Sequence, residues 1–258
     1  MSIHPTAIIS PQAKLGQGVR VGAYAMIEGD TVIGPGTEIG PHCHICRNAN
    51  IGKNCRIFTG AVIGSIPQDL KFRGEESFLE VGDNNIIREY ATINRGTDNG
   101  GKTIVGYGNL IMAYSHIAHD CRIGDGCVIA NGGTLAGHVN IEDRAIIGGL
   151  VAIHQFTRVG RLSIVGGCSK VIQDVPPYST CDGHPVKVYG LNLLGLRRAK
   201  LGKEDIHRLK AAFRILFFSR HILSRAIKDV AEKIPASPYI SYLLDFVSMS
   251  RRGICRAC

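Results

Sequence analysis

Large aliphatic residues recur at every sixth position along the first two thirds of the chain. The grid runs from Ile3 to Val171, and 26 of its 29 positions hold Ile, Leu or Val. A second column, four residues after each aliphatic, carries small or compact side chains. A period of six fits neither an α-helix, at about 3.6 residues per turn, nor a plain alternating strand. We therefore expect the chain to turn a corner once in every unit.

Three such sides close a triangular coil of about 18 residues, in which the large aliphatic fills the interior and the small residue fits beside it. Successive coils then stack about 4.8 Å apart through parallel strand hydrogen bonds. The 26 units predict a mainly β protein, a parallel β-helix of roughly nine coils. Asp69, Glu75 and Asn99 break the grid, and they fall in two expected loops, at about 64–80 and about 94–104.

The grid stops after Val171, where prolines and then a Gly183-His184-Pro185 turn signal follow. Beyond them, three apolar stripes have helical spacing, at 206–217, 222–230 and 239–247. Prolines at 235 and 238 separate the last two stripes. We predict a β-helix over residues 1–189 and a small α-helical C-terminal domain over residues 190–258.

Charge separates the two predicted parts. The net charge of the 258 residues is +9. Residues 195–258 hold 14 Lys or Arg against 5 Asp or Glu, whereas the rest of the chain is balanced. A basic domain favours an acidic partner, and no nucleic-acid-binding motif is recognisable. The chain has neither a signal-peptide pattern nor an apolar run of about 18 residues, so we expect a cytoplasmic protein without a membrane segment.

The nine cysteines do not predict a metal site. Cys43, Cys55, Cys121 and Cys127 occupy the small inward column, where a thiol behaves as a compact apolar group. Cys43 and Cys46 form a CxxC without a second pair nearby, so we expect no zinc there. At the end of the chain, Cys255 and Cys258 are expected to be exposed and reduced.

Stacking at 18 residues places an unusual group of side chains on one wall of the coil. One column reads His119, Gly137 and Gln155, and the next reads Asp120, His138 and Phe156. An imidazole suits general-base catalysis, because its ordinary pKa is about 6.5 and a neighbouring carboxylate can fix its tautomer. A glycine N–H beside it can stabilise an oxyanion. The plainer interpretations are a turn carboxylate for Asp120 and a turn glycine for Gly137.

Four stretches narrow this chemistry: QDLKFRGE (68–75), HIAHDCRIGDGCVIANGGTLAGHV (116–139), AIIGGLVAIHQF (145–156) and GGCSKVIQDVPPYS (166–179). Together they closely resemble the acyl-[acyl-carrier-protein]:UDP-N-acetylglucosamine O-acyltransferases, over roughly residues 3–198. The resemblance implies a left-handed β-helix. It also implies transfer of an (R)-3-hydroxyacyl group from an acyl carrier protein thioester to the 3-hydroxyl of UDP-N-acetylglucosamine, the first step of lipid A biosynthesis.

The same resemblance implies roles for single residues. His119 would be the general base, Asp120 would orient it, and the Gly137 N–H would stabilise the oxyanion. No acyl-enzyme and no cofactor would be needed, since the donor carries its own phosphopantetheine. Substrate contacts would come from Asp69, Lys71, His116, His138, His154, Gln155, Asn192 and Arg198, and Gly167 would leave room for a long acyl chain.

A homotrimer is also implied, with its sites in the clefts between subunits and with acyl carrier protein drawn to the basic domain. Three other readings stay open. One is an N-acyltransferase that acts on an amino-sugar nucleotide. Another is a zinc protein like the γ-class carbonic anhydrases, with histidines converging between subunits. The third is a binding solenoid without catalysis.

Overall fold

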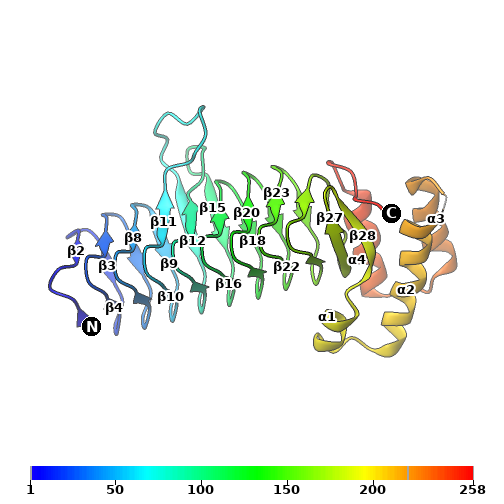
Figure 1. Cartoon of the computed structure of the whole chain (residues 1–258), viewed down its shortest axis with the longest axis horizontal. Helices are drawn as coiled ribbons and strands as arrows, with labels where there is room; N and C mark the ends of the chain where they lie inside the picture. The colour runs from blue at the N-terminus through cyan, green and yellow to red at the C-terminus, as the bar shows by residue number, and fades with distance from the viewer. Residues whose placement is uncertain (1, 220, 258) are drawn as a thin grey trace.

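The chain forms a long three-sided coil with a group of helices at its C-terminal end (Figure 1). The computed structural model describes residues 2–219 and 221–257. The coil contains 26 short parallel strands, β1 to β26, arranged in three sheets that form its three faces. The 26 hexapeptide units predicted from the aliphatic grid are therefore confirmed.

Sheet A stacks, in order, β1 (Ser2–Ile3), β4 (Arg20–Val21), β7 (Glu38–Ile39), β10 (Arg56–Ile57), β13 (Ile86–Ile87), β16 (Leu110–Ile111), β19 (Val128–Ile129), β22 (Ile146–Ile147) and β25 (Ile164–Val165). Sheet B stacks β2 (Ile8–Ile9), β5 (Met26–Ile27), β8 (His44–Ile45), β11 (Val62–Ser65), β14 (Thr92–Asn94), β17 (His116–Ile117), β20 (Thr134–Leu135), β23 (Ala152–Ile153) and β26 (Lys170–Val171). Sheet C stacks β3 (Lys14–Leu15), β6 (Val32–Ile33), β9 (Ala49–Ile51), β12 (Phe78–Val81), β15 (Lys102–Val105), β18 (Arg122–Ile123), β21 (Asn140–Ile141) and β24 (Arg158–Val159).

The core is a column of aliphatic side chains along the axis of the coil. Ile45, Ile93 and Ile129 are fully buried, as are small-column residues such as Ala25 and Cys121. Because a strand residue and its neighbour point to opposite faces, the first residue of each two-residue strand faces outward. The sequence of these outward residues therefore decides what each face of the coil presents.

The three corners of the coil are named here by the sheets that they join. The B–C corner includes residues 118–121 and 136–139, the C–A corner 124–127 and 160–163, and the A–B corner 112–115 and 166–169. The last turn residue of a corner commonly has a left-handed backbone, as at Asp120 (φ 57°) and His138 (φ 60°). This conformation turns the side chains of Asp120 and His138 away from the interior of the coil.

Both predicted loops leave the coil at the B–C corner, and they are slightly shorter than expected. They cover residues 66–77, between β11 and β12, and 95–101, between β14 and β15. The two loops lie side by side (Figure 1), joined where the Gly100 N–H donates to the Glu76 carbonyl at 2.7 Å. Together, the two loops project outward from the B–C corner near the middle of the coil.

The C-terminal part caps the last coil. An antiparallel hairpin that the hexad pattern did not predict, β27 (Ser179–Gly183) and β28 (Val186–Leu191), extends sheet A and crosses the predicted boundary at 189/190. A short helix, α1 (Leu193–Arg198), follows, and it too was not predicted. The three expected helices are α2 (Lys203–Phe218), α3 (Leu223–Lys233) and α4 (Pro238–Ser248).

The tail after α4 returns to the coil. The Cys255 N–H donates to the Asp174 carbonyl at 3.0 Å, and the Cys255 thiol lies 3.9 Å from that of Cys181. Cys255 is only 1% exposed, so the expectation of an exposed thiol was wrong for this residue, because the tail packs as a further edge on the end of the coil. Cys258 lies outside the described residues.

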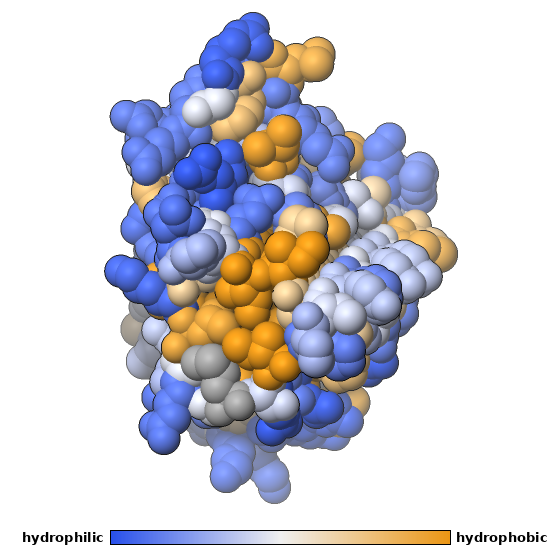
Figure 2. Space-filling model, turned by 90° about the vertical axis from the view of Figure 1, so that its left-hand side faces the viewer, coloured by the Kyte–Doolittle hydropathy of each residue, from blue (hydrophilic) through white to orange (hydrophobic). Residues whose placement is uncertain are grey.

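The opposite end of the coil is not capped within residues 2–219 and 221–257. Figure 2 views the molecule from this end and shows an apolar area in the middle of the end face. The grid residue Ile3 is 42% exposed, in contrast to Val21 and Ile39, the next grid residues of sheet A, which are 4% and 2% exposed. In the described residues, no helix is both long enough and apolar enough to pass through a bilayer.

Candidate active site at the B–C corner

His119 and Asp120 form a hydrogen-bonded pair at the B–C corner. The His119 Nδ1 lies 2.8 Å from the Asp120 Oδ2, and the two side chains are only 12% and 13% exposed. The left-handed backbone at Asp120 turns its carboxylate toward the preceding imidazole. The Asp120 N–H donates to the Thr103 hydroxyl at 2.8 Å, which fixes the turn from the coil below.

Thr97, in the 95–101 loop, holds the other side of the Asp120 carboxylate. Its hydroxyl donates to Oδ2 at 2.7 Å and its N–H lies 3.3 Å from Oδ1. Burial pushes the pKa of Asp120 up, but the donors on Thr97 and His119, together with nearby His138, outweigh it and hold the pKa below its ordinary value. Asp120 is therefore ionised at neutral pH and accepts a hydrogen bond from the Nδ1–H of His119, which leaves Nε2 as the free basic nitrogen.

Gly137 lies directly against the imidazole of His119, one coil further along. A Cβ at position 137 would come within 3.0 Å of three atoms of the His119 ring. The His138 N–H donates to the His119 carbonyl at 3.0 Å, which joins the two turns. In the described part of the chain, the Gly137 N–H has no acceptor. The structure thus brings a basic nitrogen and a bare main-chain donor to one place.

Two further histidines surround this pair. The His138 ring stacks on Phe156 with centroids 4.6 Å apart, meets His119 edge-on at 5.2 Å, and places Nε2 at 3.8 Å from the Asp120 Oδ2. His116 faces outward from β17, with Nδ1 at 2.7 Å from the Thr92 hydroxyl. Burial, and then the neighbouring His119, lower the pKa of His116, which keeps this ring neutral at physiological pH.

His154 and Gln155 occupy the same corner one coil beyond Gly137, and both are exposed. Arg252, from the C-terminal tail, reaches His154 with its Nη2 at 3.1 Å from Nδ1. Neither Thr97 nor Arg252 was identified from the sequence. Both reach the corner from outside the hexad grid, so no spacing rule connects them to it.

Among the described residues, none of the remaining predicted residues forms a hydrogen bond or an ion pair with His119. Asp69 and Lys71 lie in the 66–77 loop, where the Lys71 N–H donates to the Asp69 carboxylate at 2.9 Å. Gly167 lies at the A–B corner and is exposed; the only backbone close to a Cβ added there is that of Gly149, at 3.3 Å. The substrate roles of these residues remain predictions.

Asn192 and Arg198 lie near the C–A corner. The Asn192 side chain caps α1 by accepting from the Gly195 N–H at 3.0 Å, and donates to the Leu162 carbonyl at 2.9 Å. Arg198 is exposed in the last turn of α1. Within one chain, the predicted site residues therefore lie at all three corners of the coil.

Metal chemistry was one alternative for the histidine cluster. His119, Asp120 and His138 each offer a ligand atom, and these atoms lie within 4.8 Å of one another. The cluster contains two imidazoles and one carboxylate, a donor set that zinc accepts. Metal analysis of the active protein separates this alternative from general-base catalysis.

Comparisons with known proteins agree with the fold and with the motifs. The family model of the UDP N-acetylglucosamine O-acyltransferase domain 2 matches residues 174–255. A model of the bacterial transferase hexapeptide (six repeats) matches residues 30–65 and 102–137. The left-handed parallel β-helix with a small helical C-terminal part is thereby confirmed as the fold class.

Relatives match over nearly the whole chain. An acyl-[acyl-carrier-protein]–UDP-N-acetylglucosamine O-acyltransferase of Thermodesulfovibrio yellowstonii is 49% identical, covering 98% of this chain and 99% of the relative. One from Aliarcobacter butzleri is 46% identical, covering 98% and 97%. The crystal structure of LpxA, a UDP-N-acetylglucosamine acyltransferase from Bacteroides fragilis, superposes with a TM-score of 0.95 at 43% identity, covering 98% of this chain and 99% of that one.

Proposed function

The chain belongs to the acyl-[acyl-carrier-protein]–UDP-N-acetylglucosamine O-acyltransferase family, and from this premise we propose that the B–C corner is its active site. The chain is an acyltransferase of the first step of lipid A biosynthesis. The donor is an acyl group on acyl carrier protein and the acceptor is UDP-N-acetylglucosamine. We further propose that the acyl group is an (R)-3-hydroxyacyl chain and that it goes to the sugar 3-hydroxyl.

The His119–Asp120 pair beside the bare N–H of Gly137 carries the mechanism. His119 Nε2 removes the hydroxyl proton as the sugar oxygen attacks the thioester carbonyl carbon. Asp120 stabilises the imidazolium that forms. The carbonyl oxygen becomes an oxyanion, which accepts a hydrogen bond from the Gly137 N–H. The carbon–sulfur bond then breaks, and the imidazolium returns its proton to the departing pantetheine thiolate. No cofactor takes part, because the donor brings its own phosphopantetheine.

His119→Ala tests this assignment. We expect kcat to fall by about 10²–10⁴-fold, the usual contribution of a general base, with little change in KM. His42→Ala is the matched control, because His42 lies at the A–B corner, where it stacks on Tyr24. Mass spectrometry of the product from UDP-N-acetylglucosamine and carrier-linked acyl donors locates the new ester. Undiminished transfer by His119→Ala would remove the proposed base.

The relatives also bear on the alternatives. They are named as O-acyltransferases, so transfer to an amine is not favoured. Detection of an amide instead of an ester in the product would reverse this. Activity that requires stoichiometric zinc would favour the carbonic-anhydrase-like alternative.

We propose that the protein works as a homotrimer, and the outer surface of sheet A supports this. Along the later coils, its outward residues form a continuous aliphatic stripe, which is partly exposed: Ile86, Leu110, Val128, Ile146 and Ile164. The equivalent positions of sheet C are mostly polar: Glu80, Arg122, Asn140 and Arg158, with Ile104 as the exception. A continuous apolar stripe on a partly exposed face marks a protein–protein contact. The adjoining A–B corner adds the stacked pair Tyr90 and Tyr114.

A shared site also explains why one chain separates its predicted site residues. In our proposal, one subunit supplies the His119 corner, and a neighbouring subunit brings Arg198 and Asn192 to the nucleotide and Gly167 to the acyl chain. Because Gly167 has no side chain, it leaves space for a long acyl group, and a bulky residue at this position would restrict transfer to shorter acyl chains.

Subunit mixing tests the shared site. The His119→Ala and Arg198→Ala chains are each expected to be weakly active alone. Co-refolded mixtures contain clefts with an intact His119 from one chain and an intact Arg198 from another, and these clefts regain activity. Mixtures no more active than the sum of the parents would show that each site lies within one chain. Wild-type protein taken through the same refolding procedure, once as a mixture of two batches and once unmixed, controls for the refolding yield.

We also propose a cytoplasmic location and acyl carrier protein as the partner of the basic C-terminal helices. Both rest on the substrates named for the relatives, an acyl carrier protein and a nucleotide sugar. The second rests in addition on the exposed cations Lys210, Arg214 and Lys228 on α2 and α3.

A further inference from the structure

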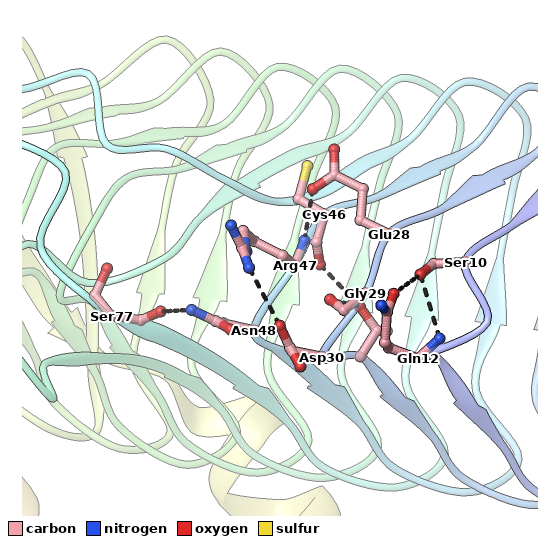
Figure 3. Close-up of polar contacts among 10 residues, drawn as sticks. Ser10, Gln12, Glu28, Gly29, Asp30, Cys46, Arg47, Asn48 and Ser77 are labelled. Atoms are coloured by element: carbon pink, nitrogen blue, oxygen red, sulfur yellow. Dashed lines mark hydrogen bonds and ion pairs between the residues drawn. The ribbon is translucent and has the colours of Figure 1, made fainter.

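A second cluster of ligand-type side chains lies near the N-terminal end of sheet B, away from the active-site residues. Glu28 follows β5, His44 lies in β8, and Cys46 follows β8. Their ligand atoms all lie within 4.8 Å of one another, and the Glu28 Oε1 is 2.8 Å from the His44 Nε2. Figure 3 shows the Cys46 sulfur close to the Glu28 carboxylate.

The register of the coil brings these three side chains together. His44 pairs with Met26 in the neighbouring strand, so Cys46 lies one rung above Glu28. His44 and Cys46 are two residues apart, and alternate residues of an extended segment share a face. The arrangement is therefore built on adjacent rungs of a rigid wall rather than on a mobile loop.

Cys46 differs from the other buried cysteines of the described chain. It is only 7% exposed, yet its sulfur has no hydrogen-bond partner among residues 2–219 and 221–257. The other six buried thiols each have one: Cys43 (Phe58 carbonyl), Cys55 (Gly82 carbonyl), Cys121 (Ala136 carbonyl), Cys127 (Glu142 carbonyl), Cys181 and Cys255 (each other). Cys46 thus places an unpartnered, buried sulfur against an imidazole and a carboxylate.

The CxxC spacing does not account for this cluster. Cys43 points into the core and donates to the Phe58 carbonyl at 2.9 Å, while Cys46 lies on the outer wall. The two thiols of the motif are therefore on opposite sides of the strand, and the partners of Cys46 come from its own strand and from the coil before it.

We propose that Glu28, His44 and Cys46 form a binding site for a divalent transition-metal ion, for which Zn²⁺ fits best. One imidazole nitrogen, one thiolate sulfur and one carboxylate oxygen are the donors that zinc takes, and three protein ligands leave a fourth tetrahedral position for water. Ligand atoms of a tetrahedral zinc site are about 3.3–3.6 Å apart, from bond lengths of about 2.0–2.3 Å. The Glu28 and His44 side chains are more than a third exposed, so they can rotate to close the remaining gap.

The surroundings of the cluster are consistent with a bound cation. The Arg47 N–H donates to the second oxygen of Glu28 at 2.9 Å and so orients the carboxylate. The Arg47 guanidinium is directed to Asp30 at 3.2 Å (Figure 3). Arg95 is buried beside Cys46 and Glu28, and its charge opposes a cation. Burial raises the pKa of the Cys46 thiol to about 11, so Cys46 becomes a thiolate only as a metal ion displaces its proton. The bound thiolate and the Glu28 carboxylate then carry two negative charges against the one on Arg95.

The cluster is separate from the catalytic corner. His44 and His116 lie in the same outward column of sheet B, with β11 and β14 between their strands. Three rung spacings of about 4.8 Å put them about 14 Å apart. A metal ion here does not contact His119 or Asp120.

Cobalt titration of the full-length, metal-free protein tests the proposal. A Co²⁺ ion bound to a thiolate gives a sulfur-to-metal charge-transfer band, whereas the His119–Asp120–His138 cluster contains no sulfur and gives none. We expect the band to saturate at one equivalent per chain, to disappear in Cys46→Ser, and to persist in Cys168→Ser, which removes the one exposed cysteine among the described residues. Absence of the band in the wild-type chain, or its persistence in Cys46→Ser, would overturn the proposal.

A second variant covers the case in which Cys46→Ser fails to fold. Glu28→Gln keeps the size and hydrogen-bonding capacity of the side chain but removes the anionic ligand. We expect it to weaken Zn²⁺ binding in calorimetry by at least the 10–100-fold typical of losing a supporting group around a metal, with an unchanged far-UV spectrum. Zinc affinity equal to that of the wild type would count against Glu28 as a ligand and against the site.

Discussion

At the scale of single residues, the catalytic corner depends on a backbone conformation that the hexad turn supplies. Asp120 is left-handed, a conformation that costs an L-residue roughly 1–2 kcal/mol but that Asp tolerates better than most. The Thr103 hydroxyl below accepts from the Asp120 N–H and fixes that turn, while the Thr97 hydroxyl above and the His119 ring hold the carboxylate. Asp120 is therefore fixed before substrate arrives.

Thr97→Val tests how much this positioning contributes. Loss of the hydroxyl removes a donor that lowers the Asp120 pKa, so that pKa rises and the carboxylate protonates at higher pH. We expect kcat to fall about tenfold, a loss of about 1.4 kcal/mol in transition-state stabilisation. NMR titration of the Asp120 carboxyl measures this rise in its pKa directly.

The same variant changes the acid stability of the protein. The lowered pKa of Asp120 contributes stability above its unfolded value of about 3.9, and this contribution is lost as the pH falls through the folded pKa. Thr97→Val reduces it, so the difference in unfolding free energy from the wild type shrinks toward low pH. Thr59→Val, at the A–B corner, is the control. An unshifted pKa of Asp120 in Thr97→Val would show that the hydroxyl does not act on Asp120.

The site residues that could be predicted from the sequence are those whose neighbours in space lie a fixed number of positions away along the chain. His119, Gly137 and Gln155 stack because the coils repeat at 18 residues, so their proximity follows from counting. Thr97 and Arg252 come from a loop and from the tail, whose paths no period describes. Glu28 lies 18 residues before Cys46, so this pair was predictable in the same way. The CxxC spacing instead relates Cys46 to Cys43, which points into the core.

At the scale of elements, the tail after α4 and the last coil meet at one carboxylate. Asp174 accepts from the Ser250 hydroxyl at 2.7 Å and from the Arg158 N–H at 2.8 Å, and its backbone pairs with Gly253 and Cys255. Burial raises the pKa of Asp174, although these donors act in the opposite direction. The hexad grid gave no indication of this junction, because it lies beyond the last repeat.

Asp174→Asn provides the test of this junction. A carboxyl with a raised pKa contributes stability below its unfolded value of about 3.9, which is lost as pH rises through the folded pKa. The neutral amide avoids that loss. We expect the unfolding free energy of the variant, relative to the wild type, to increase between about pH 4 and pH 7, as measured by urea denaturation. A difference in unfolding free energy that does not vary with pH would mean that burial does not raise the pKa of Asp174.

At the scale of the whole molecule, charge and apolar surface lie on different parts. The coil carries the aliphatic stripe on sheet A, and the helices carry the excess of positive charge. Association between subunits and attraction of an acidic carrier protein therefore use separate surfaces. Because the first depends on buried apolar area and the second on long-range charge, salt distinguishes them.

Raising the ionic strength from a low value to about 0.15 M, where the Debye length is about 8 Å, is expected to raise KM for the carrier-linked donor severalfold. A donor truncated to acyl-pantetheine lacks the acidic carrier and should show no such change. The sedimentation behaviour of the protein should not change over this range. Equal salt effects on both donors would place the carrier elsewhere on the surface.

The coil also separates its sites along its length. Each coil contacts only the coils before and after it. A structural change in one coil therefore acts mainly on its immediate neighbours. The Glu28–His44–Cys46 cluster and the His119 corner are built on different coils of the same sheet, with two strands between them. In evolutionary terms they are independent modules: a lineage can acquire or discard the first while the second goes on serving the pathway unaltered.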